Sequence, residues 1–273
     1  MKKILFSALP LLAMIAVSCG KNGEALPEND TIEFKDPNFL KVLLTYDCAY
    51  GDDPEQPIRI DADNDGKISF SEAQKVKTLV LTVLSDETAE SYNIGDISEI
   101  RYFTELEALI CDDNKLTSLD VSNNTALGLL SLDDNQLTSL DLGNNAGLVV
   151  LNCGRNRLAS IDVSKNTALK VLYLNSNQLA SVDVSNNAAL EMLFLDGNQL
   201  TSLDVSNNAG LEELSCERNR LETLDLSKNT SLTGVYCEGN ELKKIILPTE
   251  NLLDKFHIQS IIDEYGDDVI EYR

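Results

Sequence analysis

The sequence predicts a β-rich repeat solenoid, with a small, mainly helical cap before the repeats and an α/β cap after them. Near-identical units begin at every twenty-first residue from Leu106 to Leu232, without insertion. Each unit carries apolar residues at the same six positions and asparagine at the ninth, and every unit but the last also carries asparagine at the nineteenth. Because one unit cannot bury its own apolar side, successive units must stack as coils.

The apolar positions of a coil are the first, fourth, sixth, eleventh, fourteenth and sixteenth. Alternation at the fourth and sixth positions predicts a short strand whose third, fifth and seventh residues point outward. Asparagine recurs at the ninth position, from Asn114 to Asn240, and at the nineteenth, from Asn124 to Asn229. We interpret both columns as structural, because an amide can donate to and accept from the buried backbone groups of a turn.

The pattern LxxLxCxxNxL followed by TSLDVSxNxx resembles the leucine-rich repeat, and specifically the 21-residue cysteine-ladder repeats of internalin J-type bacterial surface proteins. The resemblance covers about residues 76–247. It implies a right-handed solenoid with parallel strands on a concave face, called the strand face here. It also implies a role in adhesion or recognition at a surface.

Cysteines stand at the sixth position of four coils and alternate there with leucine, so we interpret them as small buried hydrophobic residues. A disulfide between Cys216 and Cys237, on neighbouring coils, is the alternative. A fully paired disulfide framework is excluded, because five cysteines remain once Cys19 is set aside. The four sixth-position cysteines are Cys111, Cys153, Cys216 and Cys237.

The first residues predict export. Two lysines, an apolar run over residues 4–17 and the small residues around Ser18 follow the order of a secretory signal covering residues 1–18. The apolar run is too short for a permanent membrane helix. Ala16 to Cys19 resembles a bacterial lipobox, which implies that Cys19 is lipidated; an ordinary signal peptide is the alternative.

Residues 19–33 are polar and rich in Gly, Pro and Asn, so they are expected to form a flexible tether behind the lipid. Leu247-Pro248-Thr249 lacks the spacing of a cell-wall sorting signal. We therefore expect anchoring through Cys19 alone, in the outer membrane or at the cell surface of a Gram-negative bacterium.

The remaining chain divides into four parts. Residues 34–75 are predicted to form the N-terminal cap, and residues 76–105 a capping strand with an atypical entry coil. The repeats occupy residues 106–247 as seven coils, the last one partial. Residues 248–273 are predicted to form the C-terminal cap.

The N-terminal cap contains a calcium-loop motif from Asp61 to Glu72 that fits the EF-hand at every ligand position. Oxygen ligands at positions one, three, five, seven, nine and twelve, with Gly66 at six, are what a seven-coordinate hard cation requires. Pro54 and Pro57 indicate that the usual entering helix is missing, as in dockerin-like loops. We expect bound calcium in a structural role, and an acidic surface turn is the alternative. The expected ligands are Asp61, Asp63, Asp65, Lys67 through its carbonyl, Ser69 and Glu72.

Outward strand positions vary from coil to coil, whereas interior positions do not. Apolar and aromatic residues expected to be adjacent and exposed lie beside an acidic row, a pattern typical of a site for a protein with a basic patch. Alternatives are glycan binding by ring stacking, strand propensity alone, or a spacer without a ligand. The expected ligand-binding residues are Val171, Tyr173, Met192, Phe194 and Tyr236 in the patch, and Asp196, Glu217 and Glu238 in the row.

Composition narrows the function classes further. The formal charge of −23 becomes about −25 once Lys2 and Lys3 leave with the signal, so nucleic acid and anionic membrane surfaces are poor partners. His257 is the only histidine, which excludes a multi-histidine metal centre. The repeats have no irregular insertion to form a desolvated pocket, so we expect a binding protein and not an enzyme.

Overall fold

The computed structural model describes residues 31–82, 91–248 and 255–273. The chain divides into two compact units, residues 1–150 and 151–273, and each is described by itself. The predicted signal sequence, Cys19 and the tether up to residue 30 lie outside the described residues. No helix in the described ranges is both long enough and apolar enough to cross a membrane.

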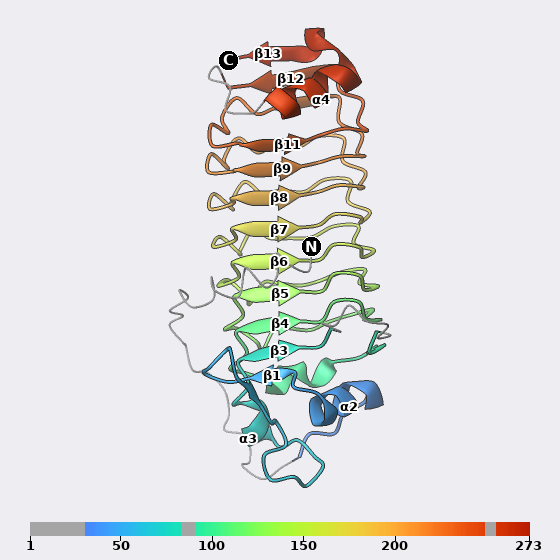
Figure 1. Cartoon of the computed structure of the whole chain (residues 1–273), viewed down its shortest axis with the longest axis vertical. Helices are drawn as coiled ribbons and strands as arrows, with labels where there is room; N and C mark the ends of the chain where they lie inside the picture. Colours follow the sequence, from blue (N-terminus) through green and yellow to red (C-terminus); the bar gives the residue numbers. More distant parts are fainter. Residues whose placement is uncertain (1–30, 83–90, 249–254) are drawn as a thin grey trace. The chain divides into compact units, whose positions relative to one another are not determined.

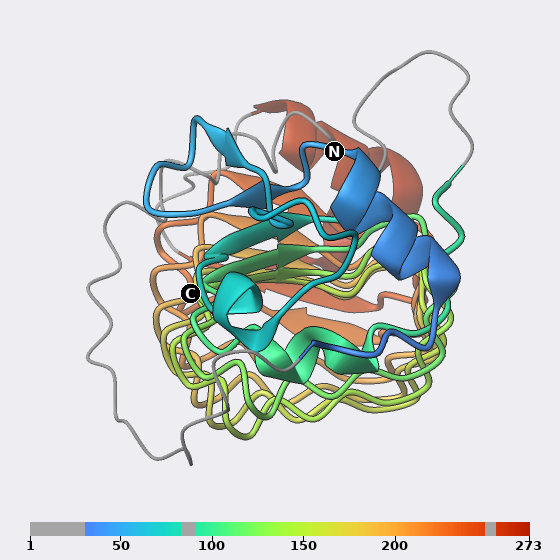
Figure 2. The ribbon, with the colours of Figure 1, turned by 90° about the horizontal axis from the view of Figure 1, so that it is seen from below.

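The N-terminal cap of the first unit combines two helices with a small antiparallel sheet. Helix α2 (Pro37–Thr45) begins at the N-cap Asp36, whose side chain accepts a hydrogen bond from the Asn38 N–H. Strands β1 (Ala49–Tyr50) and β2 (Pro57–Ile58) pair antiparallel, and β1 also pairs antiparallel with β3 (Thr78–Val80). Helix α3 (Phe70–Ala73) lies between β2 and β3 in the chain. Seen from its N-terminal end, the unit presents α2 and α3 in front of its strands (Figure 2).

Parallel strands begin at β3 and continue into the repeats of the first unit. Strand β3 pairs with β4 (Ala108–Ile110), which pairs with β5 (Leu129–Ser131), and the 3₁₀ helix η1 (Ser98–Tyr102) lies in the entry coil. The pairing of Leu109 with Leu130 reproduces the 21-residue step of the sequence. Strand β6 (Val150–Asn152) lies where the two units meet in the chain.

The second unit contains a parallel sheet of β7 (Val171–Tyr173), β8 (Met192–Phe194), β9 (Glu213–Ser215) and β11 (Gly234–Tyr236) (Figure 1). Each strand is three residues long because an inward turn follows at the seventh to ninth positions of every coil. The register again steps by 21 residues, so equivalent positions of successive coils are direct neighbours.

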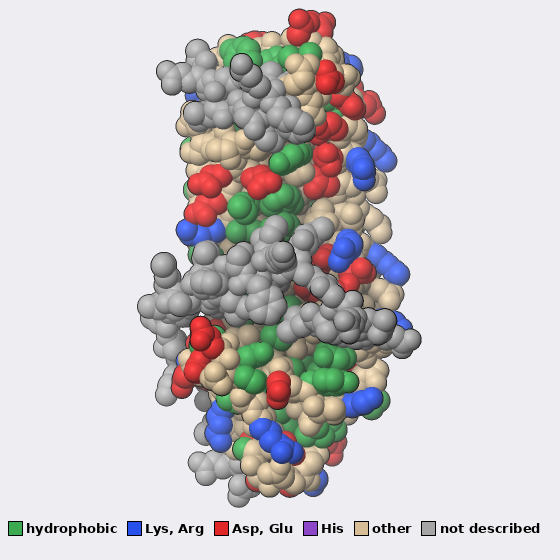
Figure 3. Space-filling model, in the orientation of Figure 1, with side chains coloured by type: hydrophobic (Ala, Val, Ile, Leu, Met, Phe, Trp, Pro, Cys, Tyr) green, Lys and Arg blue, Asp and Glu red, His purple; other side chains and the backbone are tan. Residues whose placement is uncertain are grey.

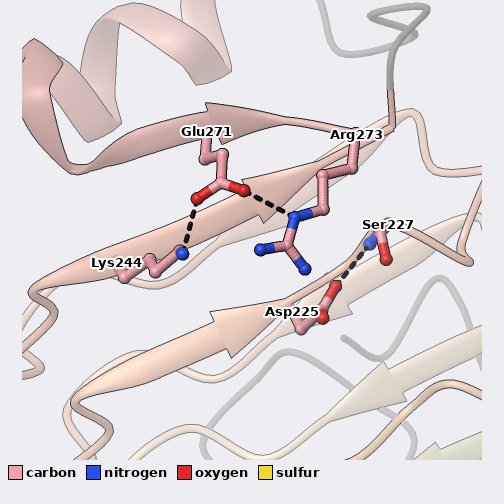
Figure 4. Close-up of polar contacts among 5 residues, drawn as sticks. All are labelled: Asp225, Ser227, Lys244, Glu271 and Arg273. Atoms are coloured by element: carbon pink, nitrogen blue, oxygen red, sulfur yellow. Dashed lines mark hydrogen bonds and ion pairs between the residues drawn. The ribbon is translucent and has the colours of Figure 1, made fainter.

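The C-terminal cap adds a second parallel sheet and a helix. Strand β10 (Thr223–Asp225) pairs with β12 (Lys244–Leu247), which pairs with β13 (Ile270–Tyr272). Helix α4 (Lys255–Tyr265) and the 3₁₀ helix η2 (Asp267–Val269) connect β12 to β13. Glu271 accepts hydrogen bonds from Lys244 and Arg273 across this sheet (Figure 4), and these bonds lower its pKa.

The leucines and cysteines at the predicted interior positions form the core of both units. Leu109, Leu130, Leu193 and Leu214 are fully buried, as are their equivalents at the first and sixth positions. The structure therefore confirms the leucine-rich-repeat right-handed solenoid with a cap at each end. The N-terminal cap is mainly helical, as predicted, because α2 and α3 make up most of its regular structure and β1 and β2 add only a short antiparallel pair.

The ninth-position asparagines satisfy the backbone of the inward turns, as predicted. In Asn198, the amide nitrogen donates to the carbonyls of Leu174 and Leu195, both at 2.9 Å, and Oδ1 accepts from the Leu179 N–H at 3.0 Å. Asn177 and Asn219 repeat this pattern. Each asparagine therefore binds its own coil to the preceding one.

Candidate functional site

The strand face of the second unit carries the predicted aromatic patch, and its centre is a stacked pair. The rings of Tyr173 and Phe194 lie 4.6 Å apart between centroids, with an interplanar angle of 11°. The strands place them together because Tyr173 and Phe194 are register partners on β7 and β8. Val171 and Met192 form the equivalent pair at the third position. The structure therefore brings these four predicted residues together.

The patch is less exposed than the sequence predicted. Tyr173 is buried, with 9% of its surface exposed, and Val171, Met192 and Phe194 are half-buried. The expectation of four exposed side chains was wrong, because neighbouring coils are close enough for the stacked rings to cover each other. Burial raises the pKa of the Tyr173 hydroxyl above its usual value.

The stacking also determines which parts of the two rings a ligand could reach. Rings that stack along the strand-to-strand direction turn their faces toward neighbouring coils, so their edges point away from the sheet. A sugar ring stacks on an exposed aromatic face. The geometry therefore favours apolar side chains of a protein over a glycan at Tyr173 and Phe194.

The three predicted acidic side chains stand at the seventh position of three successive coils of the second unit, and two of them accept hydrogen bonds within the protein. Asp196 accepts hydrogen bonds from the Ser215 hydroxyl and from the Glu217 N–H, the latter at 2.9 Å. Glu238 accepts from the Ser260 hydroxyl on α4 and from the Cys237 N–H. Asp196 therefore links adjacent coils, and Glu238 holds the C-terminal cap.

Glu217, the third predicted acidic residue, interacts with the Glu238 side chain, and the positive charge of Arg218 nearby only partly offsets its surroundings. Burial raises its pKa, and repulsion from Asp196 and Glu238 raises it further. Burial also acts on Glu238, but hydrogen bonds from Ser260 and the backbone outweigh it and lower the pKa of that carboxyl. Acidic side chains gather around hydrophobic ones over this part of the face (Figure 3).

A column of left-handed backbone at the eighth position was not predicted. The residue there has a φ between +49° and +71° in all seven coils, although only two of the seven are glycine. The sequence hardly indicates this conformation, because the residue type at the eighth position varies between Asp, Arg, Ser and Gly. The one constant feature is that the position precedes the ninth-position asparagine. The column comprises Asp113, Asp134, Arg155, Ser176, Gly197, Arg218 and Gly239.

The aspartates on the opposite side of the coils have a local role. In Asp183, Oδ1 accepts from the Ser185 N–H at 2.9 Å, and the hydroxyl and N–H of Ser185 lower the pKa of that carboxyl. Asp225 and Ser227 show the same contact (Figure 4). In each of these contacts the donor is the residue two positions after the aspartate, as with Ser122 and Asp120.

The structure brings three of the six predicted calcium ligands together. Carboxylate oxygens of Asp61, Asp63 and Asp65 lie within 4.8 Å of one another. Asp61 accepts hydrogen bonds from the N–H groups of Asp65 and Gly66, and Gly66 has a φ of +79°. These contacts form a compact turn of oxygen donors, the ligand type that calcium takes.

Glu72 is not one of these three clustered carboxylates, but it contacts the same loop. It forms a capping box with Ser69 at the start of α3, and its other oxygen accepts from the Ala62 N–H at 2.8 Å. Ile68 is fully buried, and its carbonyl accepts from the Ile32 N–H at 2.8 Å. No helix lies in the described chain between α2 and α3, as the prolines predicted.

The sixth-position cysteines are buried, in agreement with their interpretation as interior hydrophobic residues. Burial raises the pKa of the Cys237 thiol to about 12 and that of Cys216 well above its usual value. No disulfide joins Cys216 to Cys237. His257 lies in α4, and its side chain is outside the described part of the chain.

The 21-residue coils, the asparagine column and the row of short parallel strands define a leucine-rich-repeat protein with an internalin-like fold. The functional domain of InlJ from Listeria monocytogenes, which includes a cysteine ladder, is similar, with 33% identity and a TM-score of 0.57 over 68% of this chain and 46% of that chain. This chain thus spans about half of that domain.

Two further solved structures share the fold at lower identity. Internalin C2 of Listeria monocytogenes matches with a TM-score of 0.61 and 18% identity, over 88% of this chain and 94% of that one. A leucine-rich-repeat protein of Leptospira interrogans matches with a TM-score of 0.55 and 22% identity, over 73% of this chain and 62% of that one. No family model and no curated protein matches the sequence.

Proposed function

We propose that this protein is a non-catalytic recognition or adhesion protein that binds a protein partner through the strand face of its second unit. The observation that carries the proposal is the half-buried apolar and aromatic patch around Phe194, bordered by the acidic side chains of Glu213 and Glu217. Apolar clusters rimmed by charge are common at protein interfaces, where aromatic residues often supply most of the binding energy.

The seventh-position carboxylates support a non-catalytic role. Asp196 and Glu238 are held by hydrogen bonds that stabilise coil stacking and the cap. A general acid or base needs a proton that it can exchange with a substrate in a desolvated site. Side chains engaged in this way are poorly suited to that task.

A comparison of matched variants on arrays of secreted proteins and glycans tests the proposed function. The chain from Gly20 onward retains every described residue and is the form to use. We expect a protein hit that Met192→Ala/Phe194→Ala removes and Thr201→Ala/Ser202→Ala retains, because Thr201 and Ser202 are exposed and lie in the turn after the strand. A glycan hit lost in the same variant would favour the alternative ligand class. Folded protein with no hit would favour the spacer.

We also propose that the protein is exported and anchored through a lipid on Cys19, in the outer membrane or at the cell surface of a Gram-negative bacterium. The support is the order of charged, apolar and small residues before Cys19. Mass spectrometry of the mature protein should find an acylated Cys19 at its N-terminus. An unmodified N-terminus would rule out the anchor, and Cys19→Ser should release the protein from membranes.

The third part of the proposal is one structural calcium ion in the loop from Asp61 to Glu72. The clustered oxygens of Asp61, Asp63 and Asp65 support it. The Lys67 carbonyl, Ser69 and Glu72 would complete the ligand set. To bind the ion, the Glu72 carboxylate would have to rearrange its hydrogen bonds with Ser69. The ion would neutralise three neighbouring carboxylates and hold the cap in place.

A further inference from the structure

The turns that follow the strands of the second unit carry four of the seven arginines of this acidic chain. These four stand at the eighth and tenth positions of two coils, the ones that begin at Leu148 and Leu211. The two coils between them have uncharged polar residues or glycine at the same positions. We call these eight residues the arginine row: Arg155, Arg157, Ser176, Gln178, Gly197, Gln199, Arg218 and Arg220.

The arginine row lies on the surface of the unit. The ninth-position asparagines between its residues are buried, whereas the residues of the row are exposed, except for Gly197, which is half-buried. The N–H groups of Gln178, Gln199 and Arg220 each donate to the eleventh residue's carbonyl in the preceding coil, at 2.9, 2.9 and 2.8 Å. The four coils are therefore direct neighbours at this turn. Arg157 and Arg220 stand three coil spacings apart, about 14 Å.

Three arginines of the row are available to a ligand. In the described chain, Arg157, Arg218 and Arg220 form no ion pair with a carboxylate. The charge of Arg218 acts on Glu217, the residue before it, and offsets part of the repulsion there. Arg155 is engaged within the protein. The row therefore offers one guanidinium group at one end and two at the other.

Acidic side chains limit the length of the row. The coil before it has Asp134 at the eighth position, and the coil after it has Glu241 at the tenth, whereas the row itself contains no acid. Basic side chains form two groups along the edge where the strands end, with uncharged side chains between them (Figure 3). Exposed charges farther away than about 8 Å are largely screened at physiological ionic strength. A narrow anionic ligand is therefore attracted to the row despite the net charge of −23.

The side chains of the row suit a polar polymer. Guanidinium groups bind carboxylate and phosphate groups, and the similar sulfate group, through paired N–H donors. Between the arginines, Ser176, Gln178 and Gln199 can donate to and accept from hydroxyl groups. The row has no aromatic or large apolar side chain of the kind that supplies most of the binding energy at protein interfaces. A glycan therefore fits the row better than an acidic protein segment does.

The spacing of the charges also distinguishes a glycan from a nucleic acid. A nucleic acid carries a phosphate on every nucleotide, so its charge is continuous along the strand. Its phosphates would lie over the uncharged middle of the row and against Glu241 beyond the end of the row. A glycan with acidic groups separated by uncharged sugars matches arginines at the two ends and amides between them.

We propose that the arginine row binds a linear glycan whose acidic groups are separated by uncharged sugars. The guanidinium groups of Arg157 and Arg220 bind two of the acidic groups, and Gln178 and Gln199 bind sugar hydroxyls between them. This site goes beyond the proposed function, because it lies at the turns and not on the strand face and takes a different class of ligand.

Calorimetric titration of the chain from Gly20 onward with defined oligosaccharides, at low salt, tests the row. Hyaluronan octasaccharide carries a carboxylate on every second sugar, keratan sulfate octasaccharide carries sulfates in place of carboxylates, and maltooctaose is uncharged. A thymidine oligonucleotide and a glutamate peptide represent the other two classes of anionic polymer. We expect saturable binding of at least one acidic glycan and no binding of maltooctaose.

Matched variants locate that binding on the molecule. Arg157→Gln/Arg220→Gln should weaken it by about fivefold to twentyfold, because two exposed ion pairs with the ligand are lost. Lys165→Gln/Lys228→Gln removes the same charge from exposed positions at the other turn of the same two coils, and should bind as the parent does.

Several results would overturn the proposal. One is the failure of the folded parent protein to bind either acidic glycan, and another is an equal loss of binding in Lys165→Gln/Lys228→Gln. Tighter binding of the oligonucleotide or of the glutamate peptide than of both glycans would assign the row to that class of polymer instead. Met192→Ala/Phe194→Ala should leave glycan binding unchanged, so the arginine row and the proposed protein site can fail separately. Loss of the glycan in that variant would move its site to the strand face.

Discussion

Asp112 and Ser131 are joined by a hydrogen bond of 2.6 Å from the Ser131 hydroxyl to Asp112 Oδ1, which links the seventh position of one coil to the fifth position of the next. The same oxygen accepts from the Asp133 N–H at 2.9 Å. In the second unit, Asp196 makes the equivalent contacts with Ser215 and the Glu217 N–H. Seventh-position aspartates therefore hold adjacent coils together through these hydrogen bonds.

This contact leads to a prediction about pH and stability. Burial is the largest influence on Asp112 and raises the pKa of its carboxyl to about 6, despite the bonds from Ser131 and Asp133. Because the pKa is raised on folding, the folded protein binds the proton more tightly, and the free energy of unfolding falls as pH rises from about 4 to about 6. Asp112→Asn keeps an acceptor for both bonds and removes the buried charge.

We therefore expect Asp112→Asn to be more stable than the parent at pH 7.5, by about 1–3 kcal/mol, and to lose that advantage near pH 4. Urea unfolding at the two pH values measures the difference. Asp183→Asn is the matched control, because the pKa of Asp183 is lowered and its substitution should bring no gain at pH 7.5. A gain of equal size at both pH values would contradict the electrostatic explanation.

The second prediction concerns the ninth-position asparagine. Asn198→Ala leaves the carbonyls of Leu174 and Leu195 and the N–H of Leu179 without their side-chain partner inside the coil stack. We expect the free energy of unfolding to fall by about 2–4 kcal/mol, since each unsatisfied buried group costs about 1–3 kcal/mol.

Asn207→Ala is the control for this substitution. Its amide donates a single exposed bond to the Ser185 carbonyl at 3.2 Å, so its loss should cost less than about 0.5 kcal/mol. Chemical denaturation of both variants gives the comparison. Similar losses at Asn198 and Asn207 would mean that asparagine supports the turns through local conformation and not through the bonds between coils.

Much of the fold could be predicted from the sequence because the period places equivalent residues side by side. Six apolar positions per coil specified the core, and Leu109 or Leu214 could be placed in it from spacing alone. Asparagine at the ninth position has few structural roles besides bonding a turn. The adjacency of Tyr173 and Phe194 followed from the same step of 21 residues.

The candidate site was less predictable, because exposure and bonding depend on how adjacent side chains pack. Nothing in the sequence indicated that the Tyr173 and Phe194 rings would stack and bury the tyrosine. The engagement of Glu238 depends on Ser260, which lies in a cap helix outside the repeat.

The third prediction uses the left-handed column at the eighth position. Gly239 and Gly197 both have a positive φ, of +71° and +64°, so alanine at either should cost about 1 kcal/mol. A Cβ at Gly239 would also lie 3.2 Å from Arg218 Cγ and 3.3 Å from the Arg218 backbone nitrogen, whereas at Gly197 the nearest atom is 3.6 Å away.

Gly239→Ala should therefore be more destabilising than Gly197→Ala, which serves as its control for backbone strain. Thermal unfolding of the two variants measures the order. If Gly197→Ala proved the more harmful, the crowding against Arg218 would not be the limiting contact.

The fourth prediction concerns the thiols. Burial raises the pKa of Cys48 and of Cys237 to about 12, and Cys216 is fully buried. We expect the folded chain from Gly20 onward to react very slowly with a thiol reagent at pH 8, and all five cysteines to react at once in denaturant. A count of three in denaturant, after purification without reductant, would instead indicate the disulfide between Cys216 and Cys237.

The last prediction is that calcium stabilises the N-terminal cap. An ion that binds the folded loop but not the unfolded chain adds about 2.7 kcal/mol when its concentration is 100 times the Kd. The melting temperature of the chain from Gly20 onward should therefore rise in calcium and fall in chelator. Asp63→Asn/Asp65→Asn should abolish the difference, since it removes two of the three clustered carboxylates.

The control for charge is Asp47→Asn/Glu55→Gln, at two exposed positions outside the loop, which should preserve the response to calcium. A stabilisation that persisted in Asp63→Asn/Asp65→Asn would show that calcium acts on the acidic surface in general. Because Ile68, at the centre of the loop, accepts a hydrogen bond from Ile32 at the start of the described chain, protection of the Ile32 amide from hydrogen exchange should also increase in calcium. That response would connect ion binding to the segment from which the tether leaves the cap.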